Sequence, residues 1–357
     1  MKVLHLPINI ASQVGITVRA LRERGVDARG IVFNNHSYQD GEGLETYPLD
    51  SLTRSPFRGR MQRVALWRAV LKGIAWADLV HWHFRNSAIP GDFDMRYAAR
   101  LKKPRIVEFW GSDIRVPKIA SADNPYIEEM YALDPKAAEK EALKSRRTQE
   151  RFAKYGFECL IPSPEMVPFV FTDLFPKIYK SVARLVVSEL DPIFPDPKRV
   201  RPIVVHHPSN KLNKGTQAVM NAVEALKGEV DFDFQLLHGM ARDEALEAVR
   251  NADVSLGEFV SGDYGLSVLE AMALGKPTVC YIKPAVVSQL PDELPVVNAT
   301  QDNLTEVLRG LLTDGEKRHA VGRASRDYVL NYHDAAKSAE SLVGIYEELL
   351  QKESTHA

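Results

Sequence analysis

The sequence predicts an α/β protein with two doubly wound domains, and three observations favour this class. The chain has 357 residues, more than the ~250–300 at which a single core stops growing. Short apolar runs rich in β-branched residues alternate with longer segments of helical periodicity, which is typical of parallel sheets wrapped by helices. A proline-rich stretch over 191–197 interrupts this alternation, which then resumes.

The first region of alternation, over 1–190, opens with a βαβ pattern. A helix is expected to begin near Gln13 and to carry Val18 and Leu21 on one face, and Gly25 suits its left-handed C-terminal cap. Strands are expected at 2–6, 28–33, 79–83, 105–109 and 158–161. The region therefore predicts one parallel sheet.

A linker over 191–199 separates this region from a second α/β domain over 200–333, because its prolines fit neither a helix nor a central strand. The second domain is expected to hold strands at 203–206, 232–237, 254–257 and 278–282 and helices near 215–227, 243–251 and 266–274. Residues 334–357 have the periodicity of an amphipathic helix, which could pack on either domain, including back on the first.

The amino-acid composition limits the kinds of partner and the cellular location to be expected. With 45% hydrophobic and 26% charged residues and a formal net charge of -1, the chain is an ordinary globular protein with no overall charge that favours a nucleic-acid partner. Cys159 and Cys280 lie far apart in apolar runs, which indicates buried thiols in a reducing compartment. The apolar run at the start of the sequence is too short for a signal peptide, and no run reaches the ~18 apolar residues of a membrane-spanning helix. A cytoplasmic location is therefore expected.

The most informative segment is 262–277, which predicts a loop followed by a helix. Gly262 and Gly265 allow a tight turn and a close approach to a ligand, and the free amides of Leu266 and Ser267 at the helix start can receive phosphate oxygens. Glu270 is the one charge between residues 266 and 274, so it needs polar partners, which ribose hydroxyls would provide. The alternative is that Glu270 interacts only with the helix dipole or a core hydroxyl.

This segment resembles the donor loop of the group 1, family 4-like retaining glycosyltransferases with the GT-B fold. In that family two glutamates frame the loop, and the second, which binds the ribose, corresponds to Glu270. The first contacts the sugar and corresponds to Gly262, so Asp263 or Glu258 would have to substitute for it. A Gly-x-Tyr-Gly version of the loop, which here includes Tyr264, also occurs among related sequences.

Segment 206–216 is the second part of the expected donor site. Asn213 is a plausible N-cap, and Lys214 and Gly215 resemble the Lys-Gly pair that binds the donor diphosphate in the family. The family arginine that precedes this pair falls here within 208–209, so Ser209 or Lys211 would replace it. A solvated helix-start lysine is the alternative for Lys214.

Two further groups lie at expected strand ends in the second domain. His206 and His207 have no acidic or cysteine partner at ligand spacing, which favours packing and hydrogen bonding over a metal site. Gly239 and Met240 end another strand at the carboxyl edge, where a nucleotide base could lie, although an ordinary turn would have the same sequence.

The first domain would supply the acceptor side of the site. Asn9, Ser12 and Gln13 lie in the turn after the first strand, where the resembled family has a loop facing the donor phosphates. His83 ends the strand 79–83 and matches a family histidine near the transferring sugar, although a lone histidine is more often structural. Asp113 closes a Gly-Ser-Asp turn at the same carboxyl edge.

The resemblance implies two Rossmann-like domains facing a central cleft. It also implies transfer with retention of configuration, without a metal, a cofactor or a protein nucleophile. His83, Lys214 and Glu270 would be the catalytic residues, with Lys214 stabilising the leaving diphosphate. The donor would be a nucleotide-diphosphate sugar, by family precedent a UDP-sugar, and the acceptor a glycan, a lipid-linked molecule or a small molecule. A GT-B nucleotide-sugar epimerase and a non-catalytic nucleotide-sugar-binding subunit are the alternatives.

The segment 54–72 is basic and amphipathic, and no acid occurs between Asp50 and Asp78. Such a segment could lie on anionic lipid at the inner face of a membrane or bind an acidic glycan. Alternatively, its apolar stripe packs on its own sheet and its arginines are solvated.

Overall fold

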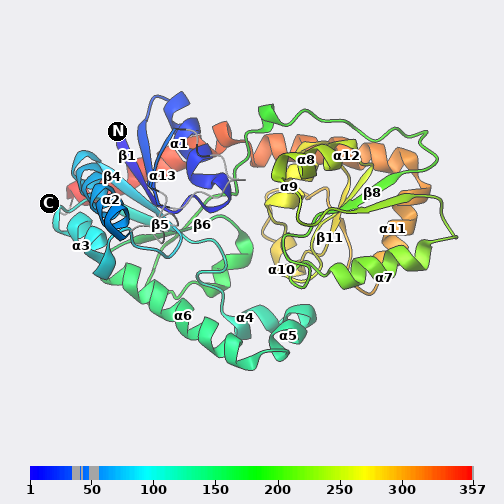
Figure 1. Cartoon of the computed structure of the whole chain (residues 1–357), viewed down its shortest axis with the longest axis horizontal. Coiled ribbons are helices and arrows are strands. Elements are labelled where there is room, and N and C mark those ends of the chain that lie inside the picture. Colours follow the sequence, from blue (N-terminus) through cyan, green and yellow to red (C-terminus); the bar gives the residue numbers. More distant parts are fainter. Residues whose placement is uncertain (34–40, 42, 48–55, 356–357) are drawn as a thin grey trace. The chain divides into compact units, whose positions relative to one another are not determined.

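The protein is described by a computed structural model that covers residues 1–33, 41, 43–47 and 56–355. Contacts between residues divide the chain into two units (Figure 1). Unit 1 contains Met1–Val116, Lys140–Arg184 and Ala335–Ala357, and unit 2 contains Pro117–Glu139 and Leu185–Asp334. Each unit is built around its own parallel sheet.

Unit 1 has a seven-stranded sheet in the order β3-β2-β1-β4-β5-β6-β7, and the strand pairs are parallel. The five strands expected from the sequence are present. Short, more polar β3 and β7 extend the two edges, where the apolar pattern is weak. The strands are β1 (Lys2–Pro7), β2 (Asp27–Val32), β3 (Leu44–Thr46), β4 (Leu79–His83), β5 (Arg105–Glu108), β6 (Glu158–Ile161) and β7 (Ile178–Lys180).

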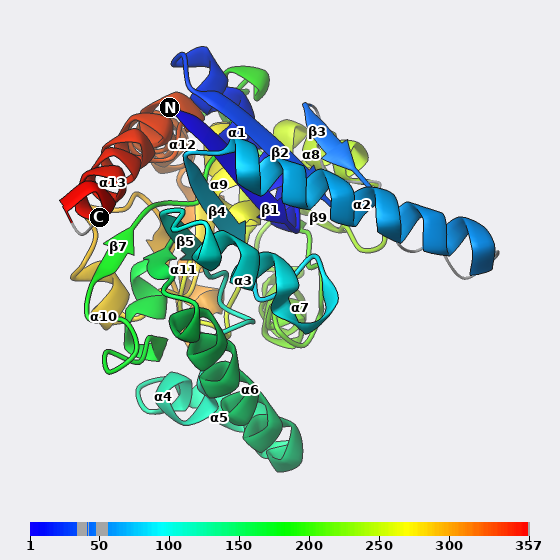
Figure 2. The same cartoon turned by 90° about the vertical axis from the view of Figure 1, so that its left-hand side faces the viewer.

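Helices cover both faces of this sheet (Figure 2). On one face α1 (Gln13–Glu23) packs with α13 (Ala335–Thr355), and the Arg24 guanidinium donates a 3.0 Å hydrogen bond to Glu340. On the other face lie α2 (Pro56–Trp76) and α3 (Phe93–Arg100). The chain also forms α6 (Pro135–Lys154), of which residues 140–154 belong to unit 1.

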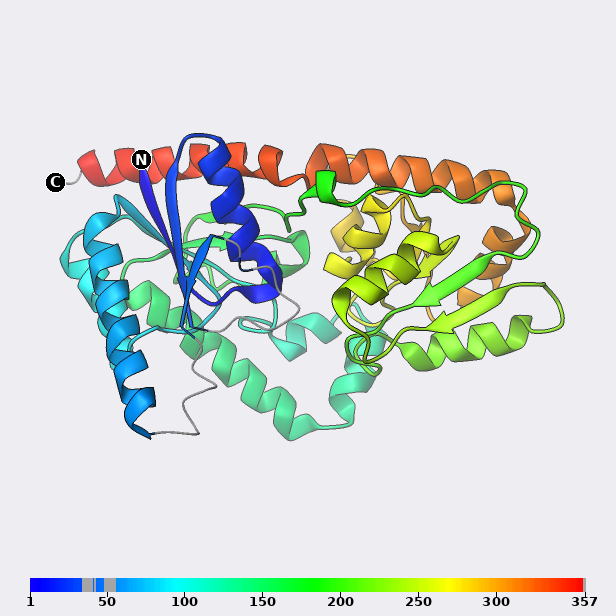
Figure 3. The same cartoon turned by 45° about the horizontal axis from the view of Figure 1, so that its top comes forward.

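Unit 2 has a five-stranded parallel sheet in the order β12-β11-β10-β8-β9. Helices flank this sheet (Figure 3). In its core, apolar residues of the strands pack against those of α7 and α11 on one face of the sheet. The helices α8, α9 and α12 pack together. The strands are β8 (Ile203–His206), β9 (Asp233–Leu236), β10 (Val254–Leu256), β11 (Thr278–Cys280) and β12 (Val297–Asn298). The helices are α7 (Thr216–Leu226), α8 (Arg242–Asn251), α9 (Leu266–Ala273), α10 (Pro284–Val287), α11 (Leu304–Thr313) and α12 (Gly315–Tyr332).

Residues 117–139, which the sequence pattern places in the first domain, belong to unit 2. This segment contains α4 (Pro117–Ser121) and α5 (Pro125–Ala132). The Asn124 amide donates to the Val260 carbonyl at 2.8 Å, and the rings of Tyr126 and Tyr281 meet edge to face with centroids 5.3 Å apart. Contacts between residues that are far apart in the sequence therefore assign this segment to unit 2. The helical periodicity of the segment cannot reveal such contacts.

Both cysteines are free and buried, as expected, and burial raises the pKa of each thiol. In the part of the chain that the structure describes, we find no helix with the length and apolarity that a membrane span requires.

Candidate functional site

The loop before α9 has the backbone that its glycines predict. Gly262 has a φ of 75°, in the left-handed region, and Gly265 occupies the N-cap position of α9. The first amides of α9, those of Leu266 and Ser267, follow directly, so an anion can bind there through backbone N–H groups. The ring of Tyr264 packs inside unit 2, edge to face with His333 at 5.7 Å between centroids.

Glu270 has a partner that the sequence did not reveal. Arg242, at the start of α8, donates a 2.6 Å hydrogen bond to its carboxylate. The Glu270 side chain is 16% exposed and that of Arg242 is 42% exposed, so one edge of the pair is open to solvent. Burial raises the pKa of Glu270, and the positive charge of Arg242 opposes this shift. Arg242 follows Gly239 and Met240 closely. Its position just after the end of a strand is the feature of the sequence that could have identified it as a candidate site residue.

Lys214 forms an ion pair with Glu258, and the Ser261 hydroxyl donates to the same carboxylate. A Cβ added at Gly265 would lie 3.6 Å from the Lys214 ammonium nitrogen and 3.7 Å from a Glu258 oxygen. The structure therefore brings together the lysine, the glutamate and the loop before α9.

The predicted N-cap is wrong by two residues. Gly215, with a φ of 69°, is the N-cap of α7, because the chain turns there in the left-handed region before the helix begins at Thr216. The backbone N–H of Asn213 instead donates to the side-chain oxygen of Asn210 at 3.0 Å, within the preceding turn. Lys214 thus stands just before the helix.

The space beside Gly262 is occupied by another side chain. A Cβ at Gly262 would overlap Cγ of Lys283 and lie 2.9 Å from its Cδ. Lys283 follows β11, and its ammonium group contacts Asp123 of the segment 117–139 at 3.0 Å. Lys283 and Asp123 are thus candidate site residues that sequence reasoning missed. The location of Lys283 just after a strand was the available signal.

The other predicted residues of unit 2 lie at the same strand ends. Ser209, Gly239 and Met240 are exposed after β8 and β9. His206 is buried and bonds the Leu256 carbonyl at 2.9 Å and the Thr216 hydroxyl at 3.0 Å, which agrees with the packing interpretation. Burial lowers the pKa of both His206 and His207 to about 4.

The predicted acceptor-side residues of unit 1 are buried and bind their own backbone. The Asn9 carboxamide accepts hydrogen bonds from the amides of residues 14 and 15 at 3.1 and 3.2 Å, and Gln13 donates to the Arg184 carbonyl at 3.0 Å. Ser12 has a φ of 64° at the start of α1. Asp113 accepts from the Trp110 amide at 2.9 Å, and burial raises the pKa of its carboxyl to about 7. These side chains shape the loops at the carboxyl ends of β1 and β5.

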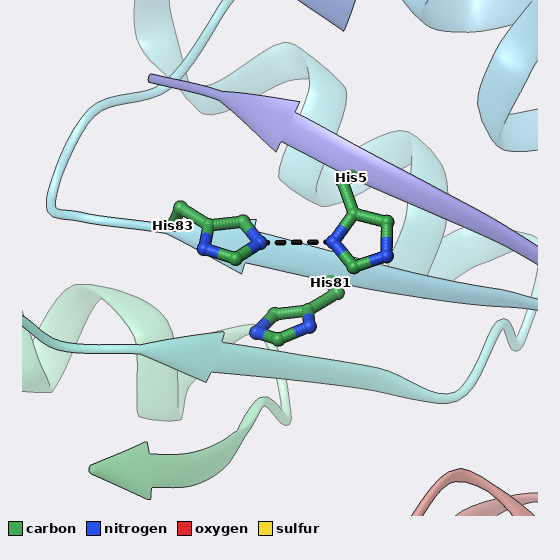
Figure 4. A group of neighbouring side chains, drawn as sticks. All are labelled: His5, His81 and His83. Atoms are coloured by element: carbon green, nitrogen blue, oxygen red, sulfur yellow. Dashed lines mark hydrogen bonds between the residues drawn. The ribbon is translucent and has the colours of Figure 1, made fainter. Parts of the chain in front are cut away.

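His83 ends β4 as predicted, but its side chain is fully buried among polar groups (Figure 4). His81 shares its face, and the two rings stack with centroids 4.1 Å apart. His5, from the adjacent β1, places Nδ1 2.9 Å from Nε2 of His83. On the other side, Glu108 of β5 lies 3.2 Å from Nδ1 of His83 and forms an ion pair with the buried Arg184.

Within the described residues, the three histidines are the group of side chains whose ligand atoms are near enough to hold a metal, all within 4.8 Å of one another. Arg184 already balances the charge of Glu108, so a divalent cation here would leave uncompensated positive charge in the core. Burial lowers the pKa of His5, His81 and His83. The cluster therefore fits neutral imidazoles joined by hydrogen bonds better than a metal centre.

Two units, each with a helix-wrapped parallel sheet, and polar residues at the strand ends of the second define a GT-B fold. The chain is similar over 99% of its length to the whole of a sucrose-phosphate synthase from Thermosynechococcus elongatus (TM-score 0.61, 13% identity). It also resembles WaaG, a glycosyltransferase involved in lipopolysaccharide biosynthesis (TM-score 0.58, 14% identity, 97% of this chain and 99% of that one). A third similar structure is Anabaena HepE in complex with UDP-glucose (TM-score 0.53, 13% identity, 98% and 100%).

No protein-family model and no curated protein sequence matches the chain. At these identities the structural likeness establishes the fold.

Proposed function

We propose that this protein is a retaining glycosyltransferase. It would transfer a sugar from a nucleotide-diphosphate donor to a glycan, a lipid-linked molecule or a small molecule, in polysaccharide or cell-envelope biosynthesis at the cytoplasmic side. The observation that carries the proposal is the convergence of Lys214, Gly265 and the start of α9, one turn before Glu270. The similarity to a structure solved with UDP-glucose supports UDP as the nucleotide.

In this proposal the diphosphate binds the amides of Leu266 and Ser267 and the ammonium group of Lys214. These groups stabilise the negative charge that develops on the leaving group, which is the main electrostatic contribution to such a reaction. A departing phosphate oxygen takes the proton of the acceptor hydroxyl on the same face of the sugar, so the chemistry needs neither a metal nor a protein nucleophile.

The carboxylate of Glu270 accepts the ribose hydroxyls, with Arg242 holding its orientation. When the diphosphate binds Lys214, Glu258 loses its cationic partner and becomes an acceptor for sugar hydroxyls, which is the role that the family glutamate has. The side chain of His83 is fully buried, so the proposal rests on Lys214 and Glu270.

The basic segment 54–72 supports peripheral contact with an anionic membrane. Residues 54–55 lie outside the described part of the chain. From residue 60 on, α2 exposes Arg60, Met61, Arg63 and Val64 side by side, a mixture of cations and apolar groups suited to a lipid surface. Retention on anionic vesicles at low salt, lost in Arg60→Ala/Arg63→Ala, is the expected result.

The donor assignment is tested by thermal unfolding of the wild type and Glu270→Ala with UDP, GDP, ADP and their sugars. A ligand at ~100 times its Kd stabilises the protein by about 2.7 kcal/mol. One nucleotide should raise the Tm of the wild type and of the control Glu244→Ala, an exposed position on α8, but not of Glu270→Ala. No shift with any nucleotide would contradict the donor site.

The second candidate function is a non-catalytic nucleotide-sugar-binding subunit, favoured by the Lys283 side chain in the space of the sugar-contacting glutamate. It predicts donor binding with neither transfer to pooled acceptors nor slow donor hydrolysis. A nucleotide-sugar epimerase would instead form a new nucleotide sugar when it is given the donor alone.

A further inference from the structure

Unit 1 has a hollow of about 580 Å³ between α2 and the strands β1, β2 and β3. It lies against the middle of the strands and not at their carboxyl ends, where Asn9 and Asp113 are found. Arg29 and Ile31 alternate along β2 and so face the same side of the sheet. Ile31 pairs with Glu45 of β3, which puts Glu45 on that side too. The helix α2 crosses this side (Figure 2).

The hollow exists because the helix presents small residues to it. Ala65, Ala69 and Gly73 follow one another at intervals of four residues and line one stripe of α2. At Gly73 the contact is already close, since an added Cβ would lie 3.0 Å from a methyl group of Leu4 and 3.1 Å from one of Ile31. Larger side chains along this stripe would fill the space that is now open.

The lining carries much more positive than negative charge: four cations, Arg22, Arg29, Arg68 and Lys72, face one acid, Glu45. Two of the four are held in place. Arg22 donates to the Ala28 carbonyl at 2.8 Å, and the Arg29 guanidinium lies 3.9 Å from the centre of the Trp76 ring.

The other two cations are available to a ligand. Arg68 and Lys72 are exposed, one helical turn apart, and neither has a hydrogen-bond or ion-pair partner among the residues that the structure describes. The one acid of the lining already has a partner within the hollow, because the Tyr47 hydroxyl donates to Glu45. Burial, followed by this hydrogen bond, raises the pKa of Tyr47 to about 12, so the hydroxyl keeps its proton.

We propose that this hollow is a binding site for a small phosphate-bearing molecule. Arg68 and Lys72 bind the phosphate, since guanidinium and ammonium groups are the side chains best suited to it. The volume lies within the ~300–1,000 Å³ typical of small-molecule sites, so it accommodates more than the phosphate alone. The rest of the ligand rests on the accessible side chains of Ala65, Ala69 and Trp76 along α2. The ligand is the phosphate ester of either a soluble sugar or a lipid headgroup.

Calorimetric titration of the full chain tests the site with two probes, glucose 1-phosphate and a short-chain phosphatidic acid below its micelle concentration, and with glucose as the neutral control. We expect at least one phosphate ester to bind, and which one binds identifies the source. Arg68→Ala/Lys72→Ala should weaken binding about tenfold or more, because each substitution removes a charge-assisted contact. Arg96→Ala/Arg100→Ala removes the same charge from exposed positions of α3, outside the hollow, and should leave the Kd within about twofold.

Ala69→Tyr fills the hollow without changing the charge and should also abolish binding. A Tm close to that of the wild type would show that unit 1 remains folded. Lys214→Ala, in unit 2, should leave this binding unchanged, which separates the site from the proposed donor site. The proposal is overturned if neither phosphate ester binds at millimolar concentration, or if the two double variants lose affinity equally.

Discussion

The clearest test of the packing of the loop before α9 is the substitution Gly262→Ala, because the structure gives two separate reasons why it must destabilise unit 2. The φ of residue 262 is 75°, a conformation that costs a residue with a Cβ about 1–2 kcal/mol. The new methyl group would also overlap Cγ of Lys283, and such overpacking costs about 1–3 kcal/mol more. The sum is about 2–5 kcal/mol, or roughly 4–20 °C in Tm for a unit of this size.

A second glycine separates the two contributions. Gly228 has a φ of 80° and nothing within 4 Å of an added Cβ, so Gly228→Ala measures the backbone cost alone. Urea unfolding should therefore show Gly262→Ala to be the less stable of the two by about 1–3 kcal/mol. Adding Lys283→Ala should remove this difference, since it deletes the overlapping atoms. Equal stabilities of Gly262→Ala and Gly228→Ala would refute the claim that Lys283 occupies the space beside residue 262.

Three further predictions concern the two units separately. Lys214→Ala should abolish nucleotide-sugar binding in a calorimetric titration, whereas Lys227→Ala, exposed just after the far end of α7, should change the affinity little; equal losses would contradict the diphosphate role of Lys214. Because the folded pKa of the buried histidines is lowered, the unfolded chain binds more protons, and the free energy of unfolding should fall as the pH drops below about 6.5. His5→Gln should reduce this slope by up to about 1.4 kcal/mol per pH unit, and an unchanged slope would refute the assignment. For Asp113 the sign is opposite: the folded pKa of about 7 lies above the ordinary 3.8, so ionisation costs stability as the pH rises between these values. Asp113→Asn should thus be more stable than the wild type at pH 8 and not at pH 3.5, as measured by urea unfolding.

Local pattern was enough to place the sheets and most of the helices. The strands of both units begin or end within about two residues of the expected positions, because buried parallel strands are short continuous apolar runs bounded by polar turns. β3, β7 and β12 have only two or three residues each and pair at sheet edges or near them, so their sequences carry no comparable apolar run.

The chemistry of the candidate site was only half visible in the sequence. The glycines of the loop and Lys214 could be predicted, since backbone approach and helix starts have local signatures. The partners of the charged residues could not: Arg242 is 28 residues from Glu270, and Asp123 is 160 residues from Lys283. Likewise, the burial of His83 depends on His5 and Glu108 from neighbouring strands, which no periodicity along one strand can show.

The division of the chain into units has a consequence for protein synthesis. Unit 1 is assembled from three segments, and the last of them, Ala335–Ala357, leaves the ribosome after all of unit 2. Its Tyr346 hydroxyl lies 2.7 Å from His81, and Arg24 reaches Glu340, so the polar cluster of the first sheet cannot be closed before α13 emerges. Domains usually fold in N-to-C order during translation. Here all of unit 2 is synthesised before the last helix of unit 1, so we expect the polar cluster of the first sheet to be completed last.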